Sequence, residues 1–370
     1  MKKRNSNYEL MRIVSMFFIV LYHTILHGNT INLAINPMVK NILYFLELIT
    51  IVHVNSFILV TGYFQSKGKF RLSKLFELMV LSFFYKLIII IGFSYFDIIS
   101  LSKTEIFKEL LPFEIVQNWY LKYFIILYCL SPFINILINK LNKSSYLKLL
   151  AVLFIFFSIG PVLTSGLSLE NNGYSLYQFI YMYLIGAYLR RYPINKEMLF
   201  TNLSAFKFKL LLVSVFFGCV ILNYCMFKYS NRLLGINNLF DQVINSFNSY
   251  NILYNNPLIV IQSLAYFIFF GTFNFTSNII NHISKMTFGI YLIHDNNYVR
   301  YNIYNWMIID SELVYSFRYF IYVGIIALII FVGCFIIDSI RSWICSHIKK
   351  CELVIKFEKW LDKFNLCDVE

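Results

Sequence analysis

Ten apolar runs occupy most of this 370-residue chain, and most are close to the ~20 residues that a helix needs to cross a bilayer. They are continuous rather than alternating, which favours membrane helices over barrel strands. The runs lie at about 10–27, 41–63, 75–96, 119–138, 147–165, 174–190, 208–227, 257–273, 283–299 and 317–339. Because 59% of the residues are apolar and 14% charged, a soluble fold could not bury them. We predict an all-α integral membrane protein, a bundle of about ten transmembrane helices.

The distribution of Lys and Arg predicts the orientation of these helices. Most of the 32 basic residues lie before the first run, after the last run or in alternate loops, and most loop acids lie in the other loops. Since basic loops usually stay in the cytoplasm, we expect both termini to be cytoplasmic. Residues 1–340 would form the transmembrane domain, and 341–370 an amphipathic tail on the anionic inner leaflet. This topology explains the net charge of +13 without a nucleic-acid partner.

The first run carries two ionisable side chains, Arg12 at its start and His23 deep inside it. Such groups are costly in hydrocarbon and usually face the protein interior. Eleven residues on a helix are close to three turns, which predicts one shared face and a separation of roughly 16 Å along the axis. This pattern favours one extended ligand held at both ends. His23 can accept a proton near neutral pH, and Glu9 lies one turn before Arg12 as its partner. We take His23 and Glu9 as the candidate catalytic residues.

A basic cluster follows the second run. We expect a helix to end at Thr61-Gly62 and a short loop to follow it. The basic residues of this loop are Lys67, Lys69, Arg71 and Lys74. Topology alone would explain these charges, and so would a polyphosphate ligand, because Lys and Arg pair well with phosphate.

Polar residues crowd one end of the ninth run. They are His294, Asp295, Asn296 and Arg300. They form a polar helix end whose hydrogen bonds are satisfied, or an acceptor site, or a support for His23. The sequence has no His-Glu-x-x-His motif and no Cys/His cluster, so we predict no metal site.

Four blocks, in this order and spacing, resemble the membrane acyltransferase 3 family of bacterial cell-surface glycan O-acyltransferases over nearly the whole chain. The first block is RNSNYELMR, which ends at Arg12 and is followed by ten residues and His23. The other three blocks are VNSFILVTGYF, NWYLKYFIILYCLSPF and FGIYLIHDNN. The chain has Thr61-Gly62-Tyr63 where the family usually has Ser-Gly-Phe, and Glu9 where it often has Asp. By position, the resemblance implies that His23 is the general base, Arg12 a donor-site residue and Arg71 part of the basic loop.

The resemblance also implies a ten-helix bundle in the bacterial cytoplasmic membrane. Such a protein moves an acyl group, usually acetyl, from cytoplasmic acyl-coenzyme A to a hydroxyl of a cell-surface or lipid-linked glycan, and acyl-coenzyme A is a co-substrate rather than a resident cofactor. A transporter or flippase for a lipid-linked glycan, or a glycan polymerase, is the alternative. Transporters often show inverted halves or paired broken helices, which this sequence lacks.

Overall fold

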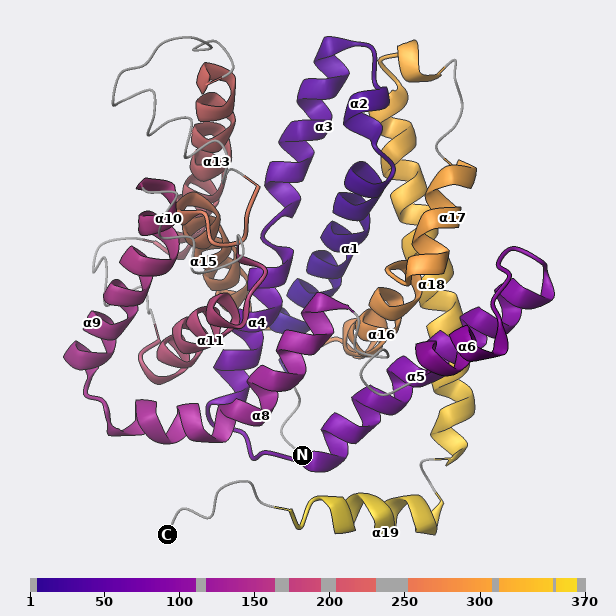
Figure 1. Cartoon of the computed structure of the whole chain (residues 1–370). Helices are drawn as coiled ribbons and strands as arrows, with labels where there is room; N and C mark the ends of the chain where they lie inside the picture. The colour runs from indigo at the N-terminus through magenta and orange to yellow at the C-terminus, as the bar shows by residue number, and fades with distance from the viewer. Residues whose placement is uncertain are drawn as a thin grey trace. The chain divides into compact units, whose positions relative to one another are not determined.

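The computed structural model describes residues 5–110, 118–163, 173–193, 204–230, 252–307, 313–348 and 351–364. Every regular element in these residues is helical, and none is a strand (Figure 1). The predicted all-α class is therefore confirmed. The chain divides into two compact units. The first comprises Met1–Ile19, Tyr44–Gly68 and Leu130–Asn281, and the second Val20–Leu43, Lys69–Cys129 and His282–Glu370.

Four helices contribute residues to both units, because a unit boundary falls inside each of them. They are α1 Asn7–His27, α3 Pro37–Thr50, α8 Trp119–Lys140 and α16 Asn278–His294. Those of the first unit alone are α4 His53–Gln65, α9 Lys143–Phe154, α10 Gly160–Leu163, α11 Leu176–Arg191, α13 Ala205–Ser230 and α15 Pro257–Gly271. Those of the second alone are α2 Thr30–Leu33, α5 Leu72–Tyr95, α6 Lys103–Glu109, α17 Asn297–Met307, α18 Tyr319–Ile348 and α19 Glu352–Leu361. A π-turn, Ile155–Ile159, joins α9 to α10, and a 3-10 turn, Leu313–Tyr315, precedes α18.

In the first unit, α4 packs closely against α11. Gly62 of α4 lies against the backbone carbonyl of Tyr183, and Gly186 of α11 lies against that of Leu59. A Cβ at either glycine would overlap backbone atoms, so these glycines allow the close approach. The prediction that the helix ends at Thr61-Gly62 is wrong for this reason: Gly62 is a packing residue, and α4 continues to Gln65.

In the second unit, α16 packs against α18 at a buried charge. Asp338 of α18 is fully buried, and it accepts hydrogen bonds from the Tyr85 hydroxyl and from Arg341 Nε, the latter at 2.7 Å. Gly289 of α16 leaves room for this carboxylate, because a Cβ there would overlap it. The arrangement places the end of α16 firmly inside the second unit.

Seven helical segments of the described residues are long and apolar enough to cross a membrane. They are Asn7–His27, Pro37–Gln65, Leu72–Tyr95, Trp119–Lys140, Lys143–Leu163, Ala205–Tyr229 and Tyr319–Ser346. The other three predicted runs form the shorter helices α11, α15 and α16. Polar residues shorten them: Ser175 and Asn256 cap the starts of α11 and α15, and Asp295 follows the end of α16.

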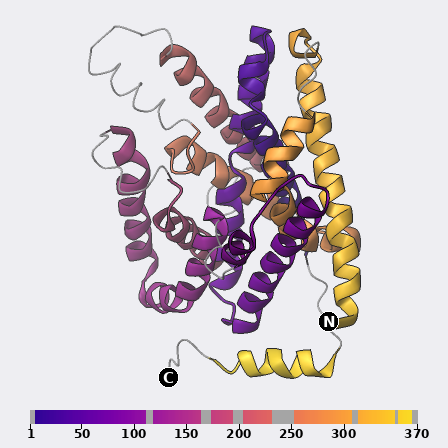
Figure 2. The same ribbon diagram turned by 45° about the vertical axis from the view of Figure 1, so that its right-hand side comes forward.

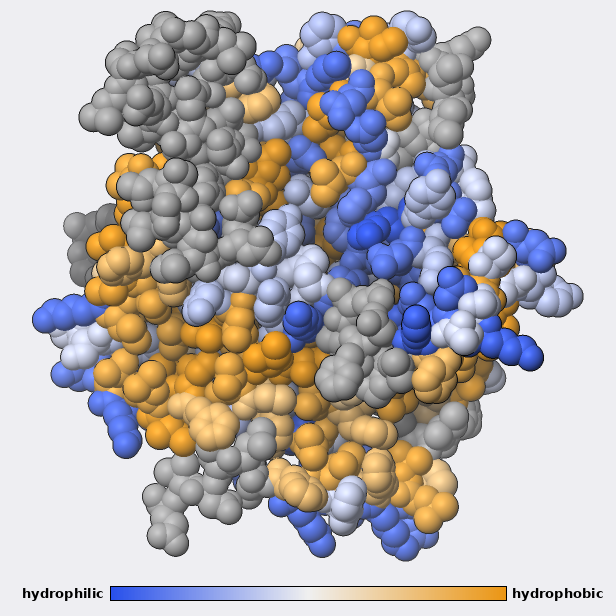
Figure 3. Space-filling view, viewed as in Figure 1, coloured by the Kyte–Doolittle hydropathy of each residue, from blue (hydrophilic) through white to orange (hydrophobic). Residues whose placement is uncertain are grey.

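The lipid-facing character of the helices is visible on their outer surfaces. Leu137 of α8 and Val152 of α9 are about half exposed, as is Leu328 of α18. The surface over α8 and α9 is largely orange in Figure 3, which marks hydrophobic residues. Exposed aliphatic side chains on long helices are expected where lipid rather than water surrounds the protein.

The first residues of the predicted tail continue α18, which runs to Ile348. The amphipathic helix α19 then lies crosswise to α18 (Figure 1, Figure 2). It packs on α5, where the rings of Phe357 and Phe76 meet edge to face with centroids 5.3 Å apart.

Candidate active site

Helix α1 carries three of the predicted site residues on one unbroken helix. In the first unit, Glu9 is buried and pairs with Arg12 at 3.3 Å, as expected for residues three apart on a helix. Arg12 keeps 29% of its side chain exposed. His23 follows three turns later, in the second unit, and only 14% of its side chain is exposed.

His23 meets the end of α16, 271 residues further along the chain. Its Nδ1 lies 3.2 Å from His294 Nε2 and 3.4 Å from the Asp295 Oδ1 carboxylate oxygen. Both partners are buried, since His294 is fully enclosed and Asp295 is 6% exposed. The nearly dry setting strengthens these interactions. The structure therefore brings together three residues that the sequence analysis placed in two separate groups.

The hydrogen bonds of this cluster select one tautomer for each neutral ring. His294 Nδ1 lies 2.7 Å from the carbonyl oxygen of Ile290, which can only accept, so Nδ1 carries the proton. A neutral His294 then has a bare Nε2 that accepts from His23 Nδ1–H. The Asp295 carboxylate is a second acceptor for the same proton. The Nε2 of His23 is left with its lone pair, which is the form that a general base requires.

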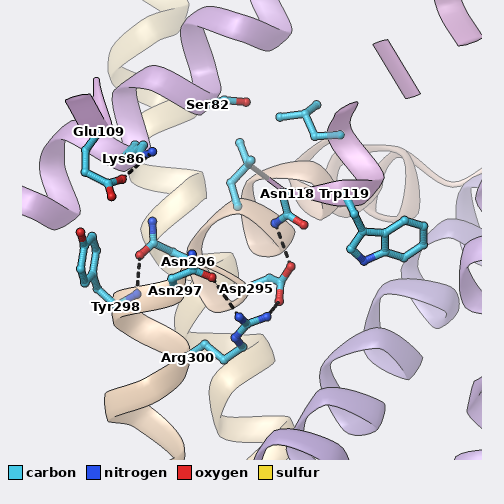
Figure 4. Close-up of a pocket in the computed structure, with 12 residues that line it drawn as sticks. Ser82, Lys86, Glu109, Asn118, Trp119, Asp295, Asn296, Asn297, Tyr298 and Arg300 are labelled. Carbon is cyan, nitrogen blue, oxygen red and sulfur yellow. Dashed lines mark hydrogen bonds and ion pairs between the residues drawn. The ribbon is translucent and has the colours of Figure 1, made fainter. Parts of the chain in front are cut away.

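Asp295 is the centre of the polar end of α16. Its Oδ2 accepts from Asn118 Nδ2 at 2.8 Å, and its Oδ1 accepts from Arg300 NH1 at 3.1 Å (Figure 4). Arg300 also donates to Asn297 Oδ1 at 2.9 Å. Asn296 has a local role, because its side-chain oxygen accepts from Tyr298 N at 3.0 Å and caps the start of α17. These contacts hold the carboxylate against His23.

A cavity of about 290 Å³ opens beside Asp295 in the second unit. Lys86 and Glu109 form an ion pair of 2.7 Å on one side of it, and the indole of Trp119 lies on the other (Figure 4). The lining residues are Ser82, Lys86, Glu109, Asn118, Trp119, Leu121, Leu292, Asp295, Asn296, Asn297, Tyr298 and Arg300. The sequence analysis did not predict Lys86 or Glu109 as site residues. Trp119 appeared there only within the block NWYLKYFIILYCLSPF.

One group of described residues has a donor set suited to a divalent cation. The ligand atoms of His23, His27 and Asp295 all lie within 4.8 Å of one another. Two imidazoles and one carboxylate are a common zinc set. The sequence analysis predicted no metal site because the chain has no His-Glu-x-x-His motif and no Cys/His cluster, and Asp295 lies too far along the chain from His23 and His27 to form a motif with them.

The basic cluster is exposed and lies at the start of α5. Lys67 belongs to the first unit, and Lys69, Arg71 and Lys74 belong to the second. Arg71 is engaged by a residue of the tail, Asp362, at 2.8 Å. The other oxygen of Asp362 accepts from the backbone N–H of Ser73 at 2.9 Å. The start of α5 therefore already holds one carboxylate.

These contacts shift the pKa of Asp362. Burial raises the pKa, but the hydrogen bonds from Ser73 and the Arg71 guanidinium outweigh that effect. The pKa of Asp362 therefore lies below its ordinary value. The carboxylate stays ionised on Arg71 at neutral pH.

The comparison with known families agrees with the resemblance. A family model described as an acyltransferase domain, that of the acyltransferase 3 family, matches residues 5–339. No curated protein matches the chain, and no solved structure does. The match favours an acyltransferase over a transporter or a polymerase. The chain belongs to the acyltransferase 3 family and is a multi-pass membrane acyltransferase.

Proposed function

We propose that the protein is an O-acyltransferase of the bacterial cytoplasmic membrane. It moves an acyl group, acetyl in the first instance, from cytoplasmic acyl-coenzyme A to a hydroxyl of a cell-surface or lipid-linked glycan. The observation that carries the proposal is the position of His23, whose Nδ1 lies between two buried acceptors, His294 and Asp295. An imidazole held in this way leaves Nε2 ready to take a proton.

His23 is the general base of the proposed reaction. Its Nε2 takes the proton of the acceptor hydroxyl as the hydroxyl oxygen attacks the thioester carbonyl carbon. The tetrahedral intermediate collapses, the carbon–sulfur bond breaks, and the coenzyme A thiolate takes the proton from the imidazolium. The products are an ester on the sugar and free coenzyme A. The Asp295 carboxylate, 3.4 Å from His23 Nδ1, stabilises the imidazolium while it exists.

The donor phosphates pair with Arg12 and with the basic residues of the loop before α5. Arg12 is held by Glu9, which is 3% exposed, and this contact fixes the guanidinium on α1. The loop residues assigned to the donor are Lys67, Lys69, Arg71 and Lys74. Support for an anion site comes from Arg71, which already binds the Asp362 carboxylate together with the Ser73 amide. If both termini are cytoplasmic, as the Lys and Arg distribution predicts, this loop lies on the cytoplasmic side of the membrane, where acyl-coenzyme A is found.

The acceptor binds near the end of α16. His294 and Asp295 orient the base, Arg300 holds Asp295 in place, and Asn296 caps α17 below them. His294 and Asp295 contact His23, and Arg300 contacts Asp295, so these three residues act as one preorganised support for His23.

The test is acyl transfer in inverted membrane vesicles that carry the wild-type protein or His23→Ala. Acetyl-coenzyme A with a labelled acetyl group is added outside, and label is counted in lipid-linked and polymeric glycan. We expect His23→Ala to lower transfer by about 10²- to 10⁴-fold, the usual contribution of a general base.

The matched control is His282→Ala, because His282 is an exposed histidine on α16 away from the cluster. Its transfer should equal that of the wild type at equal protein abundance. Transfer by His23→Ala at the wild-type rate would overturn the proposal.

A further inference from the structure

We infer that the cavity beside Asp295 binds one neutral pyranose unit of the acceptor, with the sugar ring against the indole of Trp119. This inference rests on the proposed function, since it names the acceptor class of the same site. Four observations carry it: the place of the cavity, its lining, its charges and its volume.

The place of the cavity connects it to the proposed base. Asp295 lines the cavity, and the same carboxylate lies 3.4 Å from His23 Nδ1. Asn118 and Arg300, which also line the cavity, donate to Asp295. A ligand in the cavity therefore lies beside the group that holds the imidazole.

The lining suits a sugar. A pyranose has an apolar face of C–H groups and a rim of hydroxyls. Trp119 offers an aromatic face to the first, and the electron-rich face of an indole attracts C–H groups. The amides of Asn118 and Asn297, with the hydroxyls of Ser82 and Tyr298, offer donors and acceptors to the second. Asn118, Asn297 and Ser82 each already make one hydrogen bond, but an acyl chain or another purely apolar ligand would leave the rest of their hydrogen-bonding capacity unused.

The charges of the cavity select a neutral ring. Lys86 is paired with Glu109 at 2.7 Å, and Arg300 is paired with Asp295 at 3.1 Å. Lys86 is only 10% exposed, so its pairing is costly to break. An anionic sugar such as a uronic acid would have to separate one of these pairs to gain a cation. A neutral hydroxylated ring can accept from the paired cations without displacing their partners.

The volume limits the ligand to about one ring. The cavity holds about 290 Å³, just below the ~300–1,000 Å³ typical of ligand pockets. The rest of the glycan would lie outside it. The site would thus recognise a single sugar unit within a longer chain.

The test is binding of simple glycosides to the full-length protein in lipid nanodiscs. The neutral probes are methyl glucoside, methyl galactoside and methyl N-acetylglucosaminide, and the anionic probe is methyl glucuronide. Saturation-transfer NMR measures the binding of each. We expect at least one neutral probe to bind, the glucuronide to bind at least about 10-fold more weakly, and Trp119→Ala to weaken the neutral probe about 10-fold.

Two further variants keep the result interpretable. Trp119→Phe retains an aromatic face and should keep part of the affinity, which separates stacking from misfolding. Trp306→Ala, a change at an exposed tryptophan of α17 outside the cavity lining, should bind like the wild type. The inference is overturned if no neutral probe binds, if the glucuronide binds as tightly as the best neutral probe, or if Trp119→Ala equals Trp306→Ala.

The same samples separate this inference from the proposed function. His23→Ala should keep glycoside binding and lose acyl transfer. If transfer depends on His23 but no neutral glycoside binds, the cavity assignment is wrong and the base stands. If glycosides bind as expected but transfer is unchanged in His23→Ala, the base is wrong and the cavity assignment stands.

Discussion

Two acceptors are available for the proton on His23 Nδ1, so either one alone can hold the ring in its orientation. This redundancy predicts a specific pattern of rates for variants that lack one or both acceptors. His23 Nδ1–H can donate to His294 Nε2 at 3.2 Å or to Asp295 Oδ1 at 3.4 Å. The perturbations are His294→Phe, which puts a somewhat larger ring without an acceptor atom in place of the imidazole, Asp295→Ala, and the double variant. Either single variant leaves one acceptor, so the Nδ1–H tautomer persists. The double variant removes both of these acceptors.

The magnitudes follow from the chemistry of each acceptor. A neutral hydrogen bond contributes about 0.5–1.5 kcal/mol, so His294→Phe should lower kcat about 2- to 13-fold. A bond to a charged acceptor contributes about 1.5–3 kcal/mol, so Asp295→Ala should lower kcat about 13- to 160-fold. Once both acceptors are gone, the ring is free to carry its proton on Nε2. The loss should then exceed the product of the two single losses and approach that of His23→Ala.

The assay is single-turnover transfer of labelled acetyl at saturating donor, with protein abundance and melting temperature measured for each variant. The matched control is Asn118→Ala, which removes a partner of Asp295 at its other oxygen but touches neither ring nitrogen. Its kcat should fall only a few-fold. A double variant whose loss merely equals the product of the single losses would refute the shared-proton reasoning. A single variant as slow as His23→Ala would refute the redundancy.

Four other perturbations test the remaining parts of the structure. Added Zn²⁺ should inhibit transfer, because the proposed base His23 is one of the two imidazoles that, with the Asp295 carboxylate, could hold the ion. His27→Ala should raise the half-inhibitory Zn²⁺ concentration several-fold, and equal inhibition of both proteins would count against this cluster. Asp362→Asn should lower the KM for acyl-coenzyme A by freeing Arg71, whereas an unchanged KM would remove Arg71 from the donor site. The pKa of Asp362 is lower in the folded protein than in the unfolded chain, where it is about 4. The contribution of this carboxylate to holding α19 on α5 is therefore complete above the unfolded pKa and is lost as the pH falls through the folded pKa. Hydrogen exchange of α19 should rise only in acid. Gly289→Ala should destabilise the second unit by about 1–3 kcal/mol and lower its melting temperature, because the new Cβ would overlap the buried Asp338 carboxylate. An unchanged melting temperature would contradict that packing.

Much of the helical framework was predictable from the sequence because hydropathy and length are local properties. The run at 10–27 corresponds to α1, and the run at 317–339 overlaps α18 from Tyr319 onward. The polar residues at 294–296 were expected to crowd a helix end, and α16 does end at His294. Gly62 misled the prediction, since a glycine that ends a helix and a glycine that lets two helices approach look the same in one sequence.

The basic loop shows how a correct local observation can lack its partner. The sequence placed Arg71 in a basic loop after the second run, and the residue is exposed directly before α5. Its contact with Asp362 joins residues 291 positions apart. The tail was expected on the lipid surface, and nothing in its spacing indicated that one of its carboxylates would bind α5.

The sequence by itself determined the membrane-helical class, the family and the ion pair of Glu9 with Arg12, because each depends on neighbours along the chain or on a helical spacing of a few residues. Only the tertiary structure decided that His23 meets His294 and Asp295, and that a cavity with Trp119 on one side lies beside them. Helical periodicity tells which residues of one helix share a face. Which faces of different helices meet depends on how side chains of all the helices pack together, and that information is spread over the whole chain.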